Sequence, residues 1–248
     1  MPLKRKLAIK RKRKQAEDTS PPTKRRPSAT YLTQTTLKSK NLTWFLKIYK
    51  GLEDWHLPIF RDTRSFTRAS HVLYPGSDKH LTASLVFPSV IYVDYNKNVE
   101  PVFHDSAVTQ WINDNKDYDK NTDVTFLCKR FEGRLADDES FDLLISASAG
   151  IVSTPCSRYL KVGGYFLASD AHFDARTLFL DPKFELVGVF DKDTGKLGTD
   201  AESLAGHFET TSGKIITKKQ VKESIQKSKS RRSFKLKKET WFYLFQKK

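Results

Sequence analysis

The sequence has 248 residues and a formal net charge of +15, which is enough chain for one sizeable α/β domain with tails. It holds no run of about 18 apolar residues, and no apolar stretch follows the basic N-terminus, so the sequence predicts neither a membrane-spanning helix nor a secretory signal. Its two cysteines, Cys128 and Cys156, stand in no metal-binding spacing, so we expect reduced thiols and no metal site.

The positive charge is concentrated in two segments. Residues 1–26 hold eleven Lys and Arg against two acids, and residues 214–238 hold eleven against one, so the remainder carries a net charge of −4. The first segment has no apolar periodicity, which predicts a disordered basic tail over residues 1–30. Such a tail can simply aid solubility, or it can be a nuclear-import address or a nucleic-acid-binding arm. The nucleic-acid-binding candidates in it are Lys10, Arg11, Lys12, Arg13 and Lys14.

Helices and strands are expected to alternate along residues 31–248, which we take as one domain. Apolar residues at helical spacing predict helices, short apolar runs predict buried strands, and Pro and Gly mark where both end. In chain order, the pattern predicts a helix from residue 41, a strand at 68–76, a short helix at 81–88, a strand at 90–95, a helix around 103–111, strands at 123–131 and 141–148, a helix over TPCSRYLK that ends at Gly163-Gly164, and strands in YFLASDAH and FELVGVF.

This alternation predicts βαβ units and hence a doubly wound, Rossmann-like α/β fold with a mainly parallel sheet. The stretch ETWFYLFQKK is too apolar for a loose tail, so we expect it to return to the sheet as an antiparallel last strand. Residues 195–238 would then form a basic excursion before that strand. Arg231 and Arg232 are nucleic-acid-binding candidates in this excursion, although a solvated loop would have the same composition.

Candidate ligand-binding residues follow the first two predicted strands. Doubly wound sheets bind ligands at the carboxyl ends of their strands, where the first loop must approach closely and an acid about 20 residues further on binds ribose hydroxyls. Gly76 follows the first strand, and Asp94 ends the second strand 18 positions later. The spacing therefore fits a nucleotide site.

The sequence resembles the class I S-adenosylmethionine-dependent methyltransferase superfamily over roughly residues 65–190 and 240–246. The resemblance rests on HVLYPGS, VIYVDYN, FDLLISAS, YLKVGGYFLASD and TWFYLF, in that order. It implies S-adenosylmethionine as the cofactor. It further implies a cofactor loop with Tyr74, Gly76 and Ser77, ribose binding by Asp94, an adenine site near residues 130–132, and a methyl-transfer site bordered by residues 146–148, Ser146 included.

The first loop departs from the family pattern of an acid followed by three alternating glycines. Gly76 stands alone, and Asp78 comes after it, where its charge would repel a cofactor carboxylate. A scaffold without catalysis, in a nucleic-acid-binding protein of a virion or of chromatin, is therefore the alternative. A nicotinamide-dependent enzyme is a weaker third possibility, because GxGxxG is absent.

Two further patterns concern chemistry. Pro155-Cys156 is the dipeptide that carries the nucleophile in cytosine-C5 methyltransferases, but here it falls in a helical pattern, so we expect Cys156 to be a core residue. His172 with Asp170 is the candidate catalytic pair, because a histidine near its unperturbed pKa can exchange protons at neutral pH. His80, in the first loop, is a second candidate. Polar residues at strand ends are also common without any chemistry.

The hypothesis from the sequence is a methyltransferase-like protein associated with nucleic acid. The basic segments would supply affinity for the nucleic acid, and an import receptor is a further expected partner. The expected location is the nucleus of a nucleated host or a virion, and otherwise the cytoplasm.

Overall fold

The computed structural model describes residues 39–52, 56–226 and 234–248. The chain divides into two units, Met1–Thr36 and Leu37–Lys248, and every described residue belongs to the second. The predicted tail over residues 1–30, with its candidates Lys10 to Lys14, lies outside the described residues, as do Arg231 and Arg232. In the part of the chain that is described, no helix is long and apolar enough to cross a membrane.

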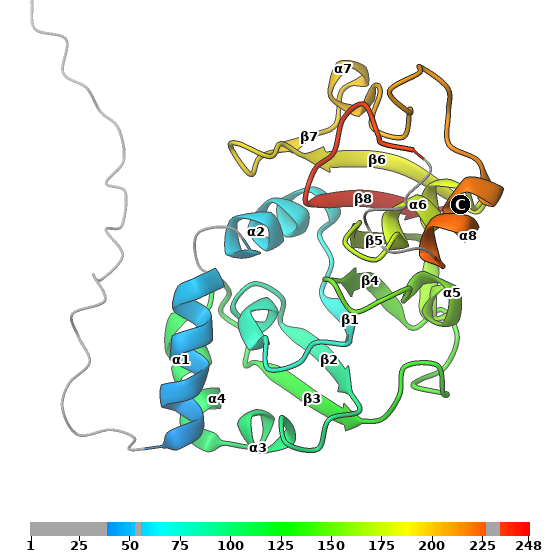
Figure 1. Cartoon of the computed structure of the whole chain (residues 1–248). Helices are drawn as coiled ribbons and strands as arrows, with labels where there is room; N and C mark the ends of the chain where they lie inside the picture. Colours follow the sequence, from blue (N-terminus) through cyan, green and yellow to red (C-terminus); the bar gives the residue numbers. More distant parts are fainter. Residues whose placement is uncertain (1–38, 53–55, 227–233) are drawn as a thin grey trace, which may run out of the picture. The chain divides into compact units, whose positions relative to one another are not determined.

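Within the described residues, eight strands form one sheet in the order β3-β2-β1-β4-β5-β8-β6-β7. Strands β1 to β5 are parallel, whereas β8 is antiparallel to both of its neighbours, β5 and β6. Figure 1 shows β8, in red, between these two strands. The predicted Rossmann-like fold and the antiparallel last strand are confirmed. The strands are β1 (His71–Pro75), β2 (Ser89–Asp94), β3 (Asp123–Cys128), β4 (Phe141–Ser146), β5 (Leu160–Ser169), β6 (Phe184–Phe190), β7 (Leu197–Gly198) and β8 (Phe242–Lys247).

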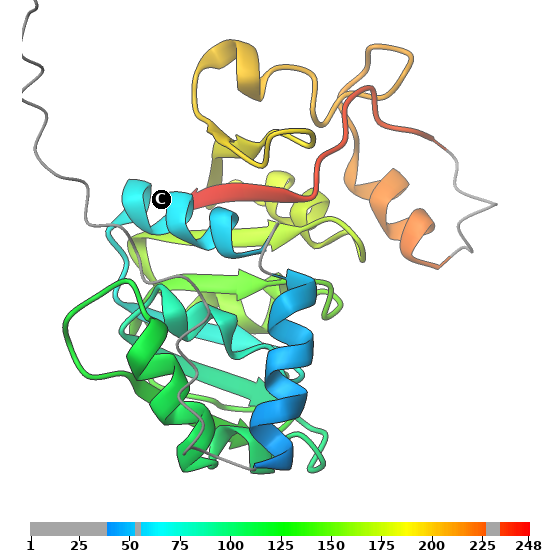
Figure 2. The ribbon, with the colours of Figure 1, turned by 90° about the vertical axis from the view of Figure 1, so that its left-hand side faces the viewer.

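Helices cover both faces of the sheet, because successive side chains of a buried strand point to opposite faces. In β1, Val72 and Tyr74 belong to one apolar core and Leu73 belongs to the other. Helices α1 and α2, on the first face, lie in front of the strands in Figure 2. The first face is covered by α1 (Lys40–Leu52), α2 (His56–Thr67), η1 (Leu81–Leu85), α3 (Glu100–Phe103) and α4 (Ser106–Asn115). The second is covered by α5 (Ser153–Cys156), η2 (Ser157–Tyr159), α6 (Asp174–Phe179) and α8 (Lys218–Ile225).

The predicted helix over TPCSRYLK is wrong at its C-terminal end. Two short turns, α5 and η2, replace it, and β5 already begins at Leu160. Gly163 and Gly164 therefore lie inside β5, close to an irregularity in its pairing with β4. Gly163 has a φ of +78°, and a Cβ on Gly164 would lie 2.9 Å from Leu160 Cδ1. The glycines thus permit a distorted strand instead of ending a helix.

The segment between β6 and β8 is the predicted excursion, and it has secondary structure of its own. It contains β7, α7 (Ala201–Leu204) and α8, and α8 begins with a capping box formed by Thr217 and Gln220. An isolated bridge pairs Thr210 with Leu236. Because β8 is antiparallel to β5 and β6, the excursion leaves and re-enters the sheet at the edge where the parallel strands end.

Candidate functional site

The parallel strands end at one side of the sheet, which we call the carboxyl edge. Gly76 follows β1, Asp94 ends β2, Ser146 ends β4 and Asp170 follows β5. In the sheet order these strands are neighbours in the sequence β2-β1-β4-β5. The fold thus brings these four predicted residues to the same edge.

Asp94 is hydrogen-bonded to the loop that follows β1. Its Oδ2 accepts a hydrogen bond from the backbone N–H of Asp78 at 3.0 Å, and its Oδ1 accepts one from the N–H of Asn96 at 2.9 Å. Asp78 has a φ of +46°, which places its N–H in a tight turn. Each carboxylate oxygen can accept a second hydrogen bond, so the half-exposed Asp94 is oriented and still able to bind a ligand hydroxyl.

Gly76 lies where the loop that follows β1 packs against the loop that follows β4. Its φ is +65°, and its N–H donates to the carbonyl of Val93 at 2.7 Å. A Cβ at this position would lie 2.2 Å from the Cβ of Ala149. Glycine is required here by the backbone conformation and by the close approach of the two loops. The neighbouring Ser77 is almost wholly buried.

Tyr74 and Ser146 lie in the core and not on the surface of the edge. The Tyr74 ring packs against Phe60 and Tyr92, with ring centroids 6.5 and 5.8 Å away, and burial raises the pKa of its phenol well above the usual range. Ser146 is fully buried at the end of β4. Both can support the site from beneath, but neither side chain is exposed to a ligand in this structure.

His172 and Asp170 are not a hydrogen-bonded pair among the described contacts. Asp170 Oδ2 accepts a hydrogen bond from Arg176 Nε at 2.6 Å, and Arg176 Nη2 donates to Glu239 at 3.1 Å. Burial raises the pKa of Asp170 to about 6, although the Arg176 guanidinium lowers it. His172 is exposed beside this cluster. The arrangement makes Asp170 the anchor of Arg176, which local sequence reasoning did not identify.

One buried carboxylate and two imidazoles also lie near the carboxyl edge. Asp174 is fully buried and accepts a hydrogen bond from the backbone N–H of Ser153 at 3.0 Å, so it caps the start of α5. His80 lies 6.0 Å from the ring of buried His56, and burial lowers the pKa of both imidazoles, that of His56 to about 3. Both histidines are therefore neutral at pH 7 and unsuited to bind an anion by charge.

Tyr95, which follows Asp94, is an aromatic residue that the sequence reasoning did not single out. Its side chain is 67% exposed, and the guanidinium of Arg130 lies 5.1 Å from the ring centroid. Arg130 opens the loop after β3, in the stretch that the resemblance assigns to the adenine site. An exposed ring beside a carboxylate can stack a base whose ribose the acid holds. In the sequence, the signal for Tyr95 is its position directly after Asp94.

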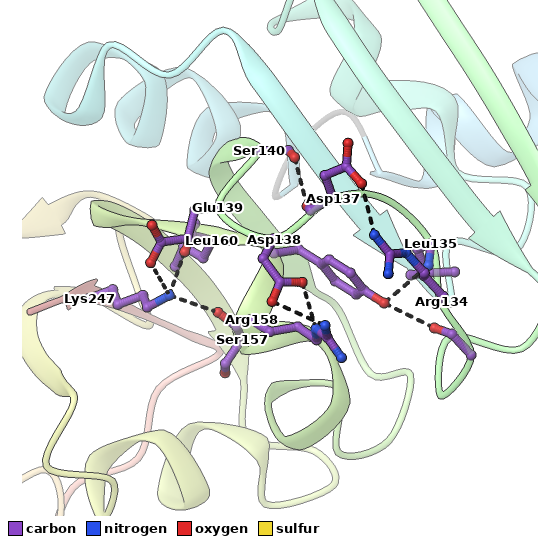
Figure 3. Close-up of polar contacts among 12 residues, drawn as sticks. Arg134, Leu135, Asp137, Asp138, Glu139, Ser140, Ser157, Arg158, Leu160 and Lys247 are labelled. Atoms are coloured by element: carbon purple, nitrogen blue, oxygen red, sulfur yellow. Dashed lines mark hydrogen bonds and ion pairs between the residues drawn. The ribbon is translucent and has the colours of Figure 1, made fainter.

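Hydrogen bonds and ion pairs hold the C-terminal part of the loop after β3, as Figure 3 shows. Arg158 donates to both carboxylate oxygens of Asp138, at 2.7 and 3.1 Å. Tyr159 Oη accepts from the N–H of Leu135 at 3.0 Å, and Lys247 Nζ forms an ion pair with Glu139 Oε1 at 3.5 Å. These contacts tie the loop to η2 and β8, so Arg130 extends from a segment that is held at both ends.

The hollows of the surface, the Cys156 thiol and the possible metal ligands do not provide a second candidate site among the described residues. Two hollows of about 320 and 360 Å³ lie opposite the carboxyl edge. The first is lined in part by Lys183, which precedes β6, and by Lys247, at the end of antiparallel β8, and the second by Asp142 and Lys161, near the starts of β4 and β5. Cys156 is fully buried, and burial raises the pKa of its thiol to about 12. It is therefore a core residue, as expected, and a poor nucleophile. Among the described residues, no group of three or more His, Cys, Asp or Glu could hold a metal ion.

The residues at this edge fit the adenosine part of S-adenosylmethionine. Asp94 offers acceptors for ribose hydroxyls, and Tyr95 offers an exposed ring beside them. The fit is poorer for the methionine part, because the exposed Asp78 carboxylate would repel the carboxylate of the cofactor. The residues at this edge thus suit the nucleoside half of the cofactor better than its amino-acid half.

Parts of the chain are similar to solved structures, among them two described as putative methyltransferases. A putative O-methyltransferase from Klebsiella pneumoniae aligns at 10% identity over 66% of this chain and 88% of that one, with a TM-score of 0.42. The YcgJ protein from Bacillus subtilis aligns at 23% identity over 46% of this chain, with a TM-score of 0.35, and the alignment spans 49% of that protein. A putative S-adenosylmethionine-dependent methyltransferase from Methanococcus maripaludis aligns at 15% identity over 55% of this chain and 67% of that one, with a TM-score of 0.37. No protein-family model and no curated protein matches the chain.

Proposed function

We propose that this protein is an S-adenosylmethionine-dependent methyltransferase that acts on nucleic acid. The observation that carries the proposal is the hydrogen bond from Asp78 N–H to Asp94, which joins the acid at the end of β2 to the loop after β1. Doubly wound folds bind the ribose of their ligands at this point of the sheet.

Each residue of the carboxyl edge has a role under this proposal. Asp94 would accept hydrogen bonds from the ribose hydroxyls, and Tyr95 and Arg130 would flank the adenine. When bound, S-adenosylmethionine supplies an electrophilic methyl group. His172, exposed two residues after Asp170, would accept a proton from the substrate.

The charge distribution supports nucleic acid as the substrate class. The described part of the second basic segment, residues 214–226 and 234–238, holds seven lysines against one acid. This segment lies in the excursion that re-enters the sheet at the carboxyl edge. Lysines there can contact phosphates while the reacting base lies near β4 and β5. The N-terminal clusters would add affinity and would serve as a nuclear-import address in a nucleated host.

The Gly76–Ala149 contact and the Asp78 charge favour a second candidate. If these two features exclude the methionine part of the cofactor, the domain is a non-catalytic nucleic-acid-binding protein that keeps only a nucleoside site. The two functions differ in one measurable property, which is the affinity for S-adenosylmethionine relative to adenosine.

Calorimetric titration with S-adenosylmethionine, its demethylated product, adenosine and NAD tests the proposal. We expect the first two ligands to bind, and Asp94→Ala to weaken them about 10- to 100-fold, since a hydrogen bond to a charged group contributes roughly 1.5 to 3 kcal/mol. The matched control is Asp191→Ala, because Asp191 also follows a strand and accepts hydrogen bonds from nearby backbone N–H groups, but it lies beyond β6. Absence of heat with every ligand at millimolar concentration would refute the proposal.

A further inference from the structure

Trp241 has an exposed side chain directly before a strand whose first residues are buried. Its side chain is 55% exposed, although the next four residues, which begin β8, are all buried. Phe242 pairs with Ser169 at the end of β5, so Trp241 lies at the carboxyl edge. An indole left in solvent at a ligand-binding edge suggests a surface that stacks on a partner.

The backbone around Trp241 is anchored on both sides. Glu239 accepts a hydrogen bond from Arg176, which is itself bound to Asp170. Thr240 donates from its N–H to Tyr243 Oη at 3.2 Å and from its hydroxyl to the Phe190 carbonyl. These contacts limit the movement of the residues next to the indole, so little ordering is needed when a ligand stacks on it.

One cation lies beside the exposed indole, and two others precede it in the chain. The ammonium of Lys192, which follows β6, lies 5.3 Å from the Trp241 ring. Lys237 and Lys238 are exposed just before it in the chain, and only Lys237 has a described ion pair, with Glu209 at 3.5 Å. An exposed aromatic ring beside a lysine combines base stacking with attraction for phosphate, which is how proteins bind single-stranded nucleic acid.

We propose that Trp241 and Lys192 form a subsite for one unpaired nucleotide, with the base stacked on the indole and a phosphate beside the ammonium. The base must be unpaired and exposed, because a duplex keeps both faces of its bases stacked. Strands β1, β4 and β5 separate β2 from β8, which places the subsite about 19 Å from the Asp94 site along the sheet. This inference rests on the proposed function and names the form of substrate that it takes.

Binding of a fluorescent single-stranded oligonucleotide to the full-length protein tests this subsite without any cofactor. We expect Trp241→Ala to weaken binding roughly 5- to 100-fold and Trp241→Phe to restore most of it. The slope of log K against log salt should not change in Trp241→Ala, whereas Lys192→Gln should reduce its magnitude by about 0.7 on single strands. The matched control is Phe66→Ala, which removes another exposed ring, at the end of α2 beside Tyr165, and should leave oligonucleotide affinity unchanged.

An abasic oligonucleotide of equal length provides a test on the unaltered protein. We expect it to bind more weakly than the complete strand to wild type and equally to wild type and Trp241→Ala. Equal affinity of wild type for the two strands, or equal affinity of wild type and Trp241→Ala for the complete strand, would overturn the subsite. The failure of S-adenosylmethionine to bind would instead refute the proposed function and leave these measurements unaffected.

Discussion

Gly76 and Ala149 are in contact across the carboxyl edge, and a Cβ built on Gly76 would lie 2.2 Å from that of Ala149. The loops after β1 and β4 are therefore positioned by each other. A side chain at residue 76 has to displace the β4 loop, which the resemblance places beside the methyl-transfer site.

This contact predicts a compensating pair of substitutions. Gly76→Ala should destabilise the domain by about 2 to 5 kcal/mol, because it combines the left-handed backbone of residue 76 with overpacking. Ala149→Gly in the same chain should recover the overpacking part and leave about 1 to 2 kcal/mol. Urea unfolding of both single variants and of the double variant measures this. A double variant as unstable as Gly76→Ala would show that Ala149 is not the obstacle.

The charge of Asp78 predicts a change in ligand preference. Asp78→Asn should strengthen S-adenosylmethionine binding about 2- to 5-fold, because it removes an exposed charge that repels the cofactor carboxylate. The affinity for adenosine, which has no carboxylate, should stay the same. Calorimetry on both ligands gives the ratio, and Asp78→Glu is the control that keeps the charge. An equal gain for both ligands would mean that Asp78 acts through the loop and not through its charge.

The buried Asp170–Arg176 pair predicts a pH-dependent loss of stability. Burial raises the pKa of Asp170 from 3.8 to about 6, so its contribution to folding is most favourable below pH 4 and declines as pH rises to 6. Arg176→Met would leave the ionised carboxylate unpaired and should cost about 3 to 5 kcal/mol at pH 8. The loss should be smaller at pH 5, where Asp170 can be protonated.

Chemical unfolding at pH 5 and pH 8 compares these losses. The control is the double variant Asp170→Asn with Arg176→Met, which has no carboxylate at this position and should show little difference between the two pH values. If Arg176→Met alone loses the same free energy at both, the charge of Asp170 is not what Arg176 neutralises.

The charge of the N-terminal segment, which lies outside the described residues, predicts that the affinity for nucleic acid depends strongly on salt. If half of its eleven Lys and Arg contact phosphates, deletion of residues 1–26 should flatten the slope of log K against log salt on duplex DNA by roughly 4 to 6. Cofactor affinity should not change. Identical slopes for the full-length and truncated proteins would leave solubility as the role of the segment. Fusion of residues 1–28 to a fluorescent protein separately tests nuclear import.

The buried strands were predictable because fully covered parallel strands are nearly continuous apolar runs, as in VIYVDY. Helix α2 was missed, since Arg61 and Asp62 interrupt its apolar spacing and Pro58 stands in its first turn. The glycine pair in β5 was misread because glycine marks both helix ends and strand irregularities.

The positions of Gly76 and Asp94 at the ends of β1 and β2 were predictable, because spacing along the chain decides them. Contacts between residues that are distant in the chain were not predictable. Arg176 and Glu239 are 63 positions apart, and no local pattern links them. The exposure of Tyr95 and Trp241 is likewise a property of the folded sheet, because aromatic residues in apolar runs are usually buried.

The position of β8 between β5 and β6 has a consequence for how this protein is made. Strand β8 begins 52 residues after β6 ends, so a chain emerging from the ribosome presents β5 and β6 long before the strand that joins them exists. Their unpaired edges are templates for pairing with other chains during that interval. Chains interrupted before residue 242 should therefore aggregate through β5 and β6, while β1 to β4 can already be assembled.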